Sequence, residues 1–124
     1  MAVKKILVAE DSPTMRQLIT FTLKKVPELT VVEAADGAEA IRLMESESFD
    51  VIITDINMPL VDGLKVLSVV RAGENTKDVP VIIVTTAGGE EDKKKGLALG
   101  ANAYLSKPIQ TAELLKIVNG YLGA

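Results

Sequence analysis

Five short aliphatic runs recur along the chain, and each is followed by a segment with the apolar spacing of a helix. The runs cover residues 5–9, 30–34, 51–54, 81–85 and 103–106. Several of them are apolar throughout, which is typical of strands that are buried on both faces of a parallel sheet. Because strand and helix alternate five times, the pattern predicts an α/β fold with a doubly wound, five-stranded parallel sheet and five helices.

The helix-like segments are predicted at residues 13–25, 37–46, 63–72, 90–100 and 111–122. Ser12 suits the N-cap position of the first helix. Apolar residues recur in this helix at a spacing close to 3.6 residues, which predicts one apolar side. Leu18 and Phe21 are among these residues. In the fourth helix, Gly100 is a stop signal, and Gly96 should weaken the middle by roughly 1 kcal/mol relative to alanine.

The length and composition fit a single globular domain over residues 1–124, since 48% of the residues are apolar and 25% are charged. No linker or repeat is present, so no attached output domain is expected. The formal net charge of −3 argues against nucleic acid or an anionic membrane as a partner. Glu10 and Asp11 cut the first apolar run too short for a signal peptide, and no uncharged stretch could cross a bilayer, so the cytoplasm is the expected location.

The chain contains no cysteine and no histidine. Disulfides, thiolate catalysis and zinc ribbons are therefore excluded together. The lack of imidazole also excludes Ser-His-Asp chemistry and most transition-metal sites. Any chemistry must come from the carboxylates, the lysines and the hydroxyl groups.

Polar residues follow four of the five predicted strands. Ligands of doubly wound sheets bind beyond the carboxyl ends of the strands, so these residues are expected to lie close together. They are Glu10 and Asp11 after the first strand, Asp55 and Asn57 at the third, Thr85 and Thr86 at the fourth, and Lys107 with Pro108 after the fifth.

Three carboxylates at one edge of a sheet need a compensating cation. Two carboxylates about 4 Å apart repel by roughly 4 kcal/mol at an effective dielectric constant near 20. A site with oxygen ligands and no histidine suits a hard ion. A site with few carboxylates, which leaves room for waters and a phosphate, suits Mg²⁺ better than Ca²⁺. Beside such an ion, one aspartate can attack phosphorus. Asp55 is the predicted nucleophile, and Lys107 is the predicted compensating charge.

Four motifs occur in a fixed order along the chain: VAEDS (8–12), ITDINMP (53–59), VIIVTT (81–86) and AYLSKP (103–108). Together, at these spacings, they resemble the response regulator receiver domains of two-component signalling, and in particular the single-domain CheY-like type. The resemblance covers essentially the whole chain. It implies a flavodoxin-like fold with the strand order 2-1-3-4-5.

The resemblance also implies a phosphoacceptor and a metal site. Asp55 is similar to the aspartate that the family phosphorylates. Asp11, Asp55 and the backbone carbonyl of Asn57 are similar to the Mg²⁺ ligands, and Glu10 is similar to an outer-sphere acid.

Further positions match the family's switching residues. Thr85 matches the switch hydroxyl by its distance along the chain from both Asp55 and Lys107, and Thr86 is the weaker candidate. Lys107 resembles the phosphate-binding lysine, and its peptide bond to Pro108 is expected to be cis. Tyr104 resembles the aromatic residue that swings inward when the threonine hydroxyl moves to the phosphoryl group.

A receiver of this kind works through protein partners. A chain without histidine cannot form phosphohistidine, so the resemblance implies a separate histidine kinase as phosphodonor. The output face would consist of the fourth helix, the fifth strand and the last helix, and the protein is expected to be a monomer or a weak dimer. It is not expected to be a dedicated enzyme, although it should catalyse phosphorylation and dephosphorylation of its own aspartate. Ala87, two residues beyond Thr85, has no group to orient water, which leaves the lifetime of the phosphoryl form open.

Two other functions are compatible with the same residues. One is an Mg²⁺-dependent aspartyl-phosphate phosphatase that acts on an outside substrate and would need a substrate pocket. The other is an adaptor that binds its partner through the last-helix surface without phosphorylation. Chemotaxis, phosphorelay and pilus control also stay open as roles, because one chain shows only its half of the contact.

Overall fold

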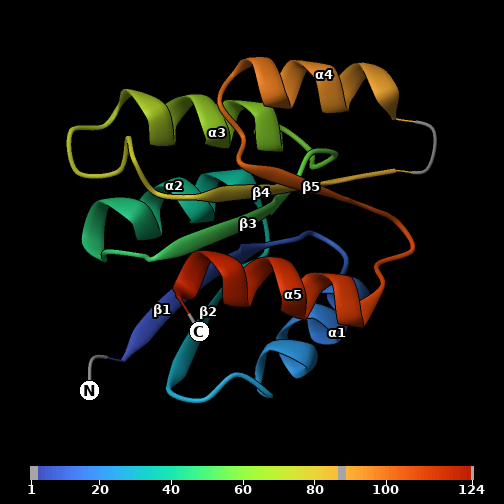
Figure 1. The fold of residues 1–124 in the computed structure, drawn as a ribbon. Coiled ribbons are helices and arrows are strands. Elements are labelled where there is room, and N and C mark those ends of the chain that lie inside the picture. Colours follow the sequence, from blue (N-terminus) through green and yellow to red (C-terminus); the bar gives the residue numbers. More distant parts are fainter. Residues whose placement is uncertain (1–2, 87–88, 124) are drawn as a thin grey trace.

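The computed structural model describes residues 3–86 and 89–123 and has three layers, with a sheet between two layers of helices (Figure 1). The strands are β1 (Lys4–Ala9), β2 (Leu29–Ala34), β3 (Val51–Asp55), β4 (Val81–Thr85) and β5 (Ala103–Ser106). The helices are α1 (Pro13–Leu23), α2 (Gly37–Ser46), α3 (Gly63–Ala72), α4 (Glu90–Ala98) and α5 (Thr111–Leu122). The predicted α/β fold is therefore confirmed.

Neighbouring strands of the sheet are parallel, and their order is β2-β1-β3-β4-β5. This is the order that the family resemblance implied. Strand β3 lies at the centre, and every residue of β3 and of its neighbour β4 is buried. The winding of such a sheet reverses between β1 and β3, so a ligand site is expected at the carboxyl ends of these two strands.

The side chains of the central strands alternate between two apolar clusters. Ile52 and Ile83 belong to the cluster that includes residues of α2 and α3, whereas Ile53 and Ile82 belong to the cluster that includes residues of α1 and α5. Figure 1 shows α2, α3 and α4 over one face of the sheet and α1 with α5 over the other. Because both faces are covered, the central strands are apolar up to the polar residues at their carboxyl ends.

The helix boundaries agree closely with the sequence prediction. Helices α2, α3 and α5 begin and end at the predicted residues. Helix α1 ends two residues early, at Leu23, and its N-cap Ser12 accepts a hydrogen bond from the backbone N–H of Met15. Helix α4 ends at Ala98 and is followed by Gly100, which has a φ of 102°. None of the helices within the described ranges has the length and apolar character needed to cross a membrane.

Two expectations about helix faces were wrong or incomplete. Leu18 and Phe21 are 37% and 69% exposed, although the apolar spacing placed them on the apolar side of α1. The helix packs through Ile19 instead, and Phe21 lies two positions further on, so a 3.6-residue period directs it away from the sheet. Gly96 is more than a weak point in α4, because a Cβ there would collide with Cδ1 of Ile83. The glycine allows the helix to lie close to β4.

Candidate functional site

The three acidic side chains that follow β1 and β3 lie together at the carboxyl edge of the sheet. One carboxylate oxygen of each of Glu10, Asp11 and Asp55 lies within 4.8 Å of the others. Glu10 and Asp55 are buried, each with 1% of its surface exposed, whereas Asp11 is exposed. The parallel pairing of β1 with β3 brings these chain-distant residues to one place.

Lys107 approaches the acidic group from the end of β5. Its Nζ donates a hydrogen bond to Oδ2 of Asp55 over 3.0 Å and lies 3.4 Å from Oε1 of Glu10. Its backbone N–H donates to the carbonyl of Thr85 over 2.8 Å, so the end of β4 positions the lysine. The peptide bond between Lys107 and Pro108 is cis, as the resemblance implied.

The close packing of these charges changes their pKa values. The pKa of Glu10 is raised from 4.5 to about 7. Burial is the largest cause and the nearby Asp55 adds to it, whereas the backbone N–H of Ser12 and the ammonium of Lys107 act in the opposite direction. Burial acts to lower the pKa of Lys107, but its hydrogen bond to Asp55 and the charges of Asp55 and Glu10 outweigh burial and raise it overall. The metal-free site thus holds a proton on Glu10 more readily than an exposed carboxylate would.

The surroundings of the Glu10 carboxylate indicate whether the cluster of Glu10, Asp11 and Asp55 fits a cation. Oε2 accepts a hydrogen bond from the backbone N–H of Ser12 over 3.0 Å. Oε1 is buried and forms no hydrogen bond with the residues that the structure describes, although the Nζ of Lys107 lies 3.4 Å away as an ion-pair partner. A buried carboxylate oxygen without a donor is unfavourable, and nearby carboxylates increase the cost. The oxygen-only group therefore fits a small, hard divalent cation.

The start of α3 packs directly against the strand end that carries Asp55. A Cβ at Gly63 would collide with the backbone carbonyl of Asp55, so only glycine allows this approach. Asp62 caps the helix by accepting a hydrogen bond from the backbone N–H of Lys65 over 2.9 Å. The backbone N–H of Asn57 donates to Oδ1 of Asp55 over 3.3 Å. Both carboxylate oxygens of Asp55 therefore have donors, one from Lys107 and one from the following loop.

The sequence-predicted switch residues lie on β4 and β5. Thr85 is buried, and its Oγ1 donates to the carbonyl of Leu105 over 3.5 Å, which is at the long limit for a hydrogen bond. Thr86 is exposed. Tyr104 is 37% exposed on β5. Ala87 lies outside the described residues.

Two contacts near the site were missed from the sequence. Arg16 on α1 donates from Nη1 to the backbone carbonyl of Glu10 over 2.6 Å, and its Nε lies 3.1 Å from Oε1 of Glu33. The Nζ of Lys93 on α4 lies 3.9 Å from the ring centroid of Tyr104. The position of Arg16 in the first turns of α1, five residues after Asp11, was a usable signal for the first contact. The second depends on how α4 packs beside β5, which no local pattern indicates.

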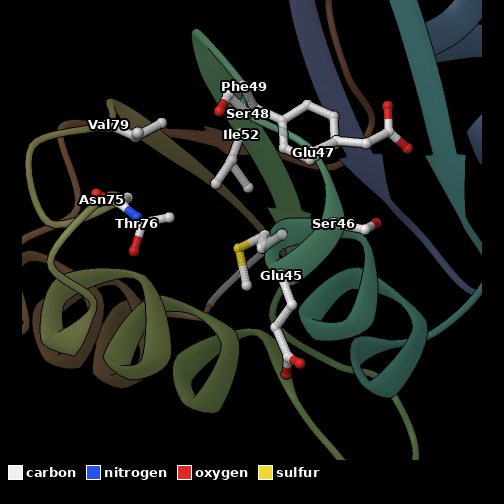
Figure 2. Close-up of a pocket in the computed structure, with 10 residues that line it drawn as sticks. Glu45, Ser46, Glu47, Ser48, Phe49, Ile52, Asn75, Thr76 and Val79 are labelled. Carbon is white, nitrogen blue, oxygen red and sulfur yellow. The ribbon is translucent and has the colours of Figure 1, made fainter.

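A separate hollow lies at the opposite, amino edge of the sheet. It has a volume of about 170 Å³ and lies between the end of α2 and the loop that precedes β4 (Figure 2). Met44, Ile52 and Val79 contribute apolar surface, and Asn75 and Thr76 contribute polar groups. None of the sequence-predicted site residues lines it, so it does not belong to the acidic site.

Comparisons of the sequence and of the fold with known proteins point to the same family. Residues 6–119 match the family described as the response regulator receiver domain. A chemotaxis protein CheY homolog of Campylobacter jejuni is 42% identical over 113 residues, which cover 90% of this chain and 86% of that protein. The chemotaxis protein CheY4 of Vibrio cholerae is 37% identical, with a TM-score of 0.88 over 97% of this chain and 99% of that one.

A further solved structure bears on the metal. It is the receiver domain of the sensor histidine kinase PA1611 from Pseudomonas aeruginosa, crystallised with a magnesium ion coordinated in its active site cleft. It is 34% identical to this chain, with a TM-score of 0.89 over 99% of this chain and 100% of that one.

Proposed function

The chain belongs to the response regulator receiver family, and from this membership we propose that it is a single-domain response regulator that accepts a phosphoryl group on Asp55 from a histidine kinase. The observation that carries the proposal is the hydrogen bond of 3.0 Å from Lys107 to Asp55 within a cluster of three carboxylates. A buried aspartate held between a lysine and two further acids suits attack on phosphorus better than it suits a purely structural role.

Asp55 is the proposed nucleophile. A carboxylate oxygen of Asp55 forms a bond to phosphorus while the bond between phosphorus and the histidine nitrogen of the kinase breaks. The electron pair of the broken bond returns to the imidazole, which takes up a proton and leaves as neutral histidine. The rigid end of β3 and the N–H of Asn57 fix the direction from which the carboxylate approaches.

Asp11, Asp55 and the backbone carbonyl of Asn57 would hold Mg²⁺, and Glu10 would act from the outer sphere. When bound, the ion neutralises the carboxylates and stabilises the negative charge on the transferring oxygens. Two observations support this metal: the three carboxylates whose oxygens lie within 4.8 Å of one another, and the magnesium in the related PA1611 receiver.

Lys107 and Thr85 are the proposed phosphate-binding groups. The ammonium of Lys107 already lies beside Asp55, so it can pair with the phosphoryl oxygens as they arrive. The long hydrogen bond of the Thr85 hydroxyl to Leu105 is weak, so this hydroxyl can turn to a phosphoryl oxygen at little cost.

The proposed output is a population shift of the face formed by α4, β5 and α5. In the structure the ring of Tyr104 points outward, and the residue is 37% exposed. When the Thr85 hydroxyl moves towards the phosphoryl group, it leaves space into which this ring can swing. The inward ring changes the surface that a downstream protein binds. Hydrolysis of the aspartyl phosphate ends the signal.

The test is phosphotransfer from histidine kinases of the source organism, each autophosphorylated with labelled ATP. Wild-type protein should take the label rapidly from at least one kinase in the presence of Mg²⁺, and Asp55→Asn should take none. Catalytic release of phosphate from generic phosphomonoesters would favour the phosphatase instead. Partner binding that is unchanged in Asp55→Asn and unaffected by phosphodonor would favour the adaptor.

A further inference from the structure

Leu60 is an exposed leucine held in the left-handed backbone region, in the loop between β3 and α3. Its φ is 67°, and its side chain is fully exposed at 105% of the reference area. A Cβ makes this conformation unfavourable, whereas glycine or asparagine adopts it readily. Single exposed apolar residues are ordinary on protein surfaces. Leu60 differs from them because the leucine is unfavourable at its position both for the backbone and for solvation.

Backbone hydrogen bonds and a close contact with α2 hold the loop around Leu60. The backbone N–H of Val61 donates to the carbonyl of Pro59 over 2.8 Å, and the N–H of Gly63 donates to the carbonyl of Ile56 over 2.9 Å. The carbonyl of Val61 packs so closely on α2 that a Cβ at Gly37 would collide with it. The fold therefore fixes the turn and directs the leucine outward.

The loop also fixes how far Leu60 lies from the phosphoacceptor. Leu60 lies three positions before Gly63, which packs on the carbonyl of Asp55, so its Cα lies at most about 11 Å from that of Gly63. Asp55 is only 1% exposed, so a protein that donates to it must cover the loops around the opening. A standard interface covers about 800 Å² on each partner, which is wide enough to include Leu60.

We propose that Leu60 is a docking contact for the protein phosphodonor, which covers this leucine with an apolar surface next to its phosphohistidine. The inference rests on the proposed function and names one surface that the donor must contact. A small donor such as acetyl phosphate has no surface that reaches Leu60. The leucine should therefore matter for transfer between proteins and not for the chemistry at Asp55.

The experiment compares Leu60→Asn, Leu60→Met and the wild type with two donors, acetyl phosphate and the kinase that transfers fastest to the wild type. Loss of a buried leucine contact should slow transfer from the kinase to Leu60→Asn by about tenfold or more. Leu60→Met should stay close to the wild type, because it keeps an apolar side chain of similar volume. Labelling by acetyl phosphate should be the same for all three proteins.

Val3→Asn is the matched control, because Val3 is a 64% exposed apolar residue before β1, at the opposite edge of the sheet. It should transfer at the wild-type rate. The melting temperature of Leu60→Asn should equal or exceed that of the wild type, since asparagine tolerates the positive φ.

Equal transfer from the kinase to Leu60→Asn and the wild type would overturn the inference. A lower melting temperature, or an equal slowing with acetyl phosphate, would also overturn it, because either would indicate a structural role. Failure of acetyl phosphate to label the wild type at Asp55 is a different result, and it would contradict the proposed function itself.

Discussion

Lys107 forms an ion pair with Asp55 and also approaches Glu10, with its Nζ 3.0 Å from Oδ2 of Asp55 and 3.4 Å from Oε1 of Glu10. One cation from the end of β5 thus compensates two buried carboxylates from the ends of β1 and β3. This arrangement links three strands at one point of the sheet edge. It also places a positive charge where the oxygens of an incoming phosphoryl group would gather.

Replacement of Lys107 should therefore impair phosphorylation. Loss of one preorganised group that stabilises transition-state charge slows reactions by about 10²-fold or more, and we expect such a decrease for Lys107→Ala. The measurement is the rate of Asp55 phosphorylation by acetyl phosphate at saturating Mg²⁺. Lys107→Arg, which keeps the charge, should retain part of the rate. A wild-type rate for Lys107→Ala would show that the ion pair has no part in the chemistry.

Glu10 should make the stability of the metal-free protein depend on pH. Its pKa is raised from 4.5 to about 7 in the folded protein, so the folded state holds a proton that the unfolded state has already lost between these values. The free energy of unfolding should therefore fall as pH rises from 4.5 to 7, by no more than about 1.4 kcal/mol per pH unit.

Urea unfolding with EDTA across this pH range measures the effect. The matched variant is Glu10→Gln, which cannot titrate and should show a flatter dependence. Added Mg²⁺ should restore stability most strongly at the upper end of the range, where Glu10 is ionised. An identical slope in Glu10→Gln would rule out Glu10 as its source.

Much of the fold could be predicted because its signals are local. The apolar runs and the helix cap at Ser12 depend on neighbouring residues only, and the helix boundaries followed from such local signals. The meeting of Glu10 and Asp55 could also be expected, because parallel strands bring their carboxyl ends to one edge. The strand order came from the family resemblance and not from the pattern of residues.

The features that the sequence did not reveal depend on packing between elements. Phe21 is an exception, because its place two positions after the buried Ile19 already directs it to the other side of a helix, and its apolar character alone led to the wrong expectation. The close approach of Gly96 to the Ile83 side chain became clear only from the packing of α4 on β4. The left-handed conformation of Leu60 is imposed by contacts on both sides of its loop, and leucine itself gives no signal for it.

Two glycines with opposite surroundings give a test of packing at the site. Gly63→Ala would place a Cβ against the carbonyl of Asp55, which is backbone and cannot move aside, so we expect a loss of about 1–3 kcal/mol in the free energy of unfolding. Gly120→Ala in α5 meets nothing within 4 Å and should stabilise the protein by roughly 1 kcal/mol. Chemical denaturation of both variants measures the difference. Equal effects of the two substitutions would contradict the close approach of α3 to Asp55.

The contact between Lys93 and Tyr104 should favour the outward position of the ring. The ammonium lies 3.9 Å from the ring centroid, and an inward swing would break this contact. Lys93→Met should therefore shift the unphosphorylated protein towards the inward position. The chain has two tyrosines, so the ring signals of Tyr104 can be resolved by NMR. Lys94→Met on the same helix is the control, and an equal shift there would show that the contact itself is not responsible.

The central claim is tested most directly by treating the protein with acetyl phosphate and Mg²⁺ and locating the product by mass spectrometry. We expect one phosphoryl group per chain, removed by hydroxylamine, located on the peptide that contains Asp55, and absent from Asp55→Asn. A phosphoryl group on another peptide, or labelling that persists in Asp55→Asn, would contradict the account.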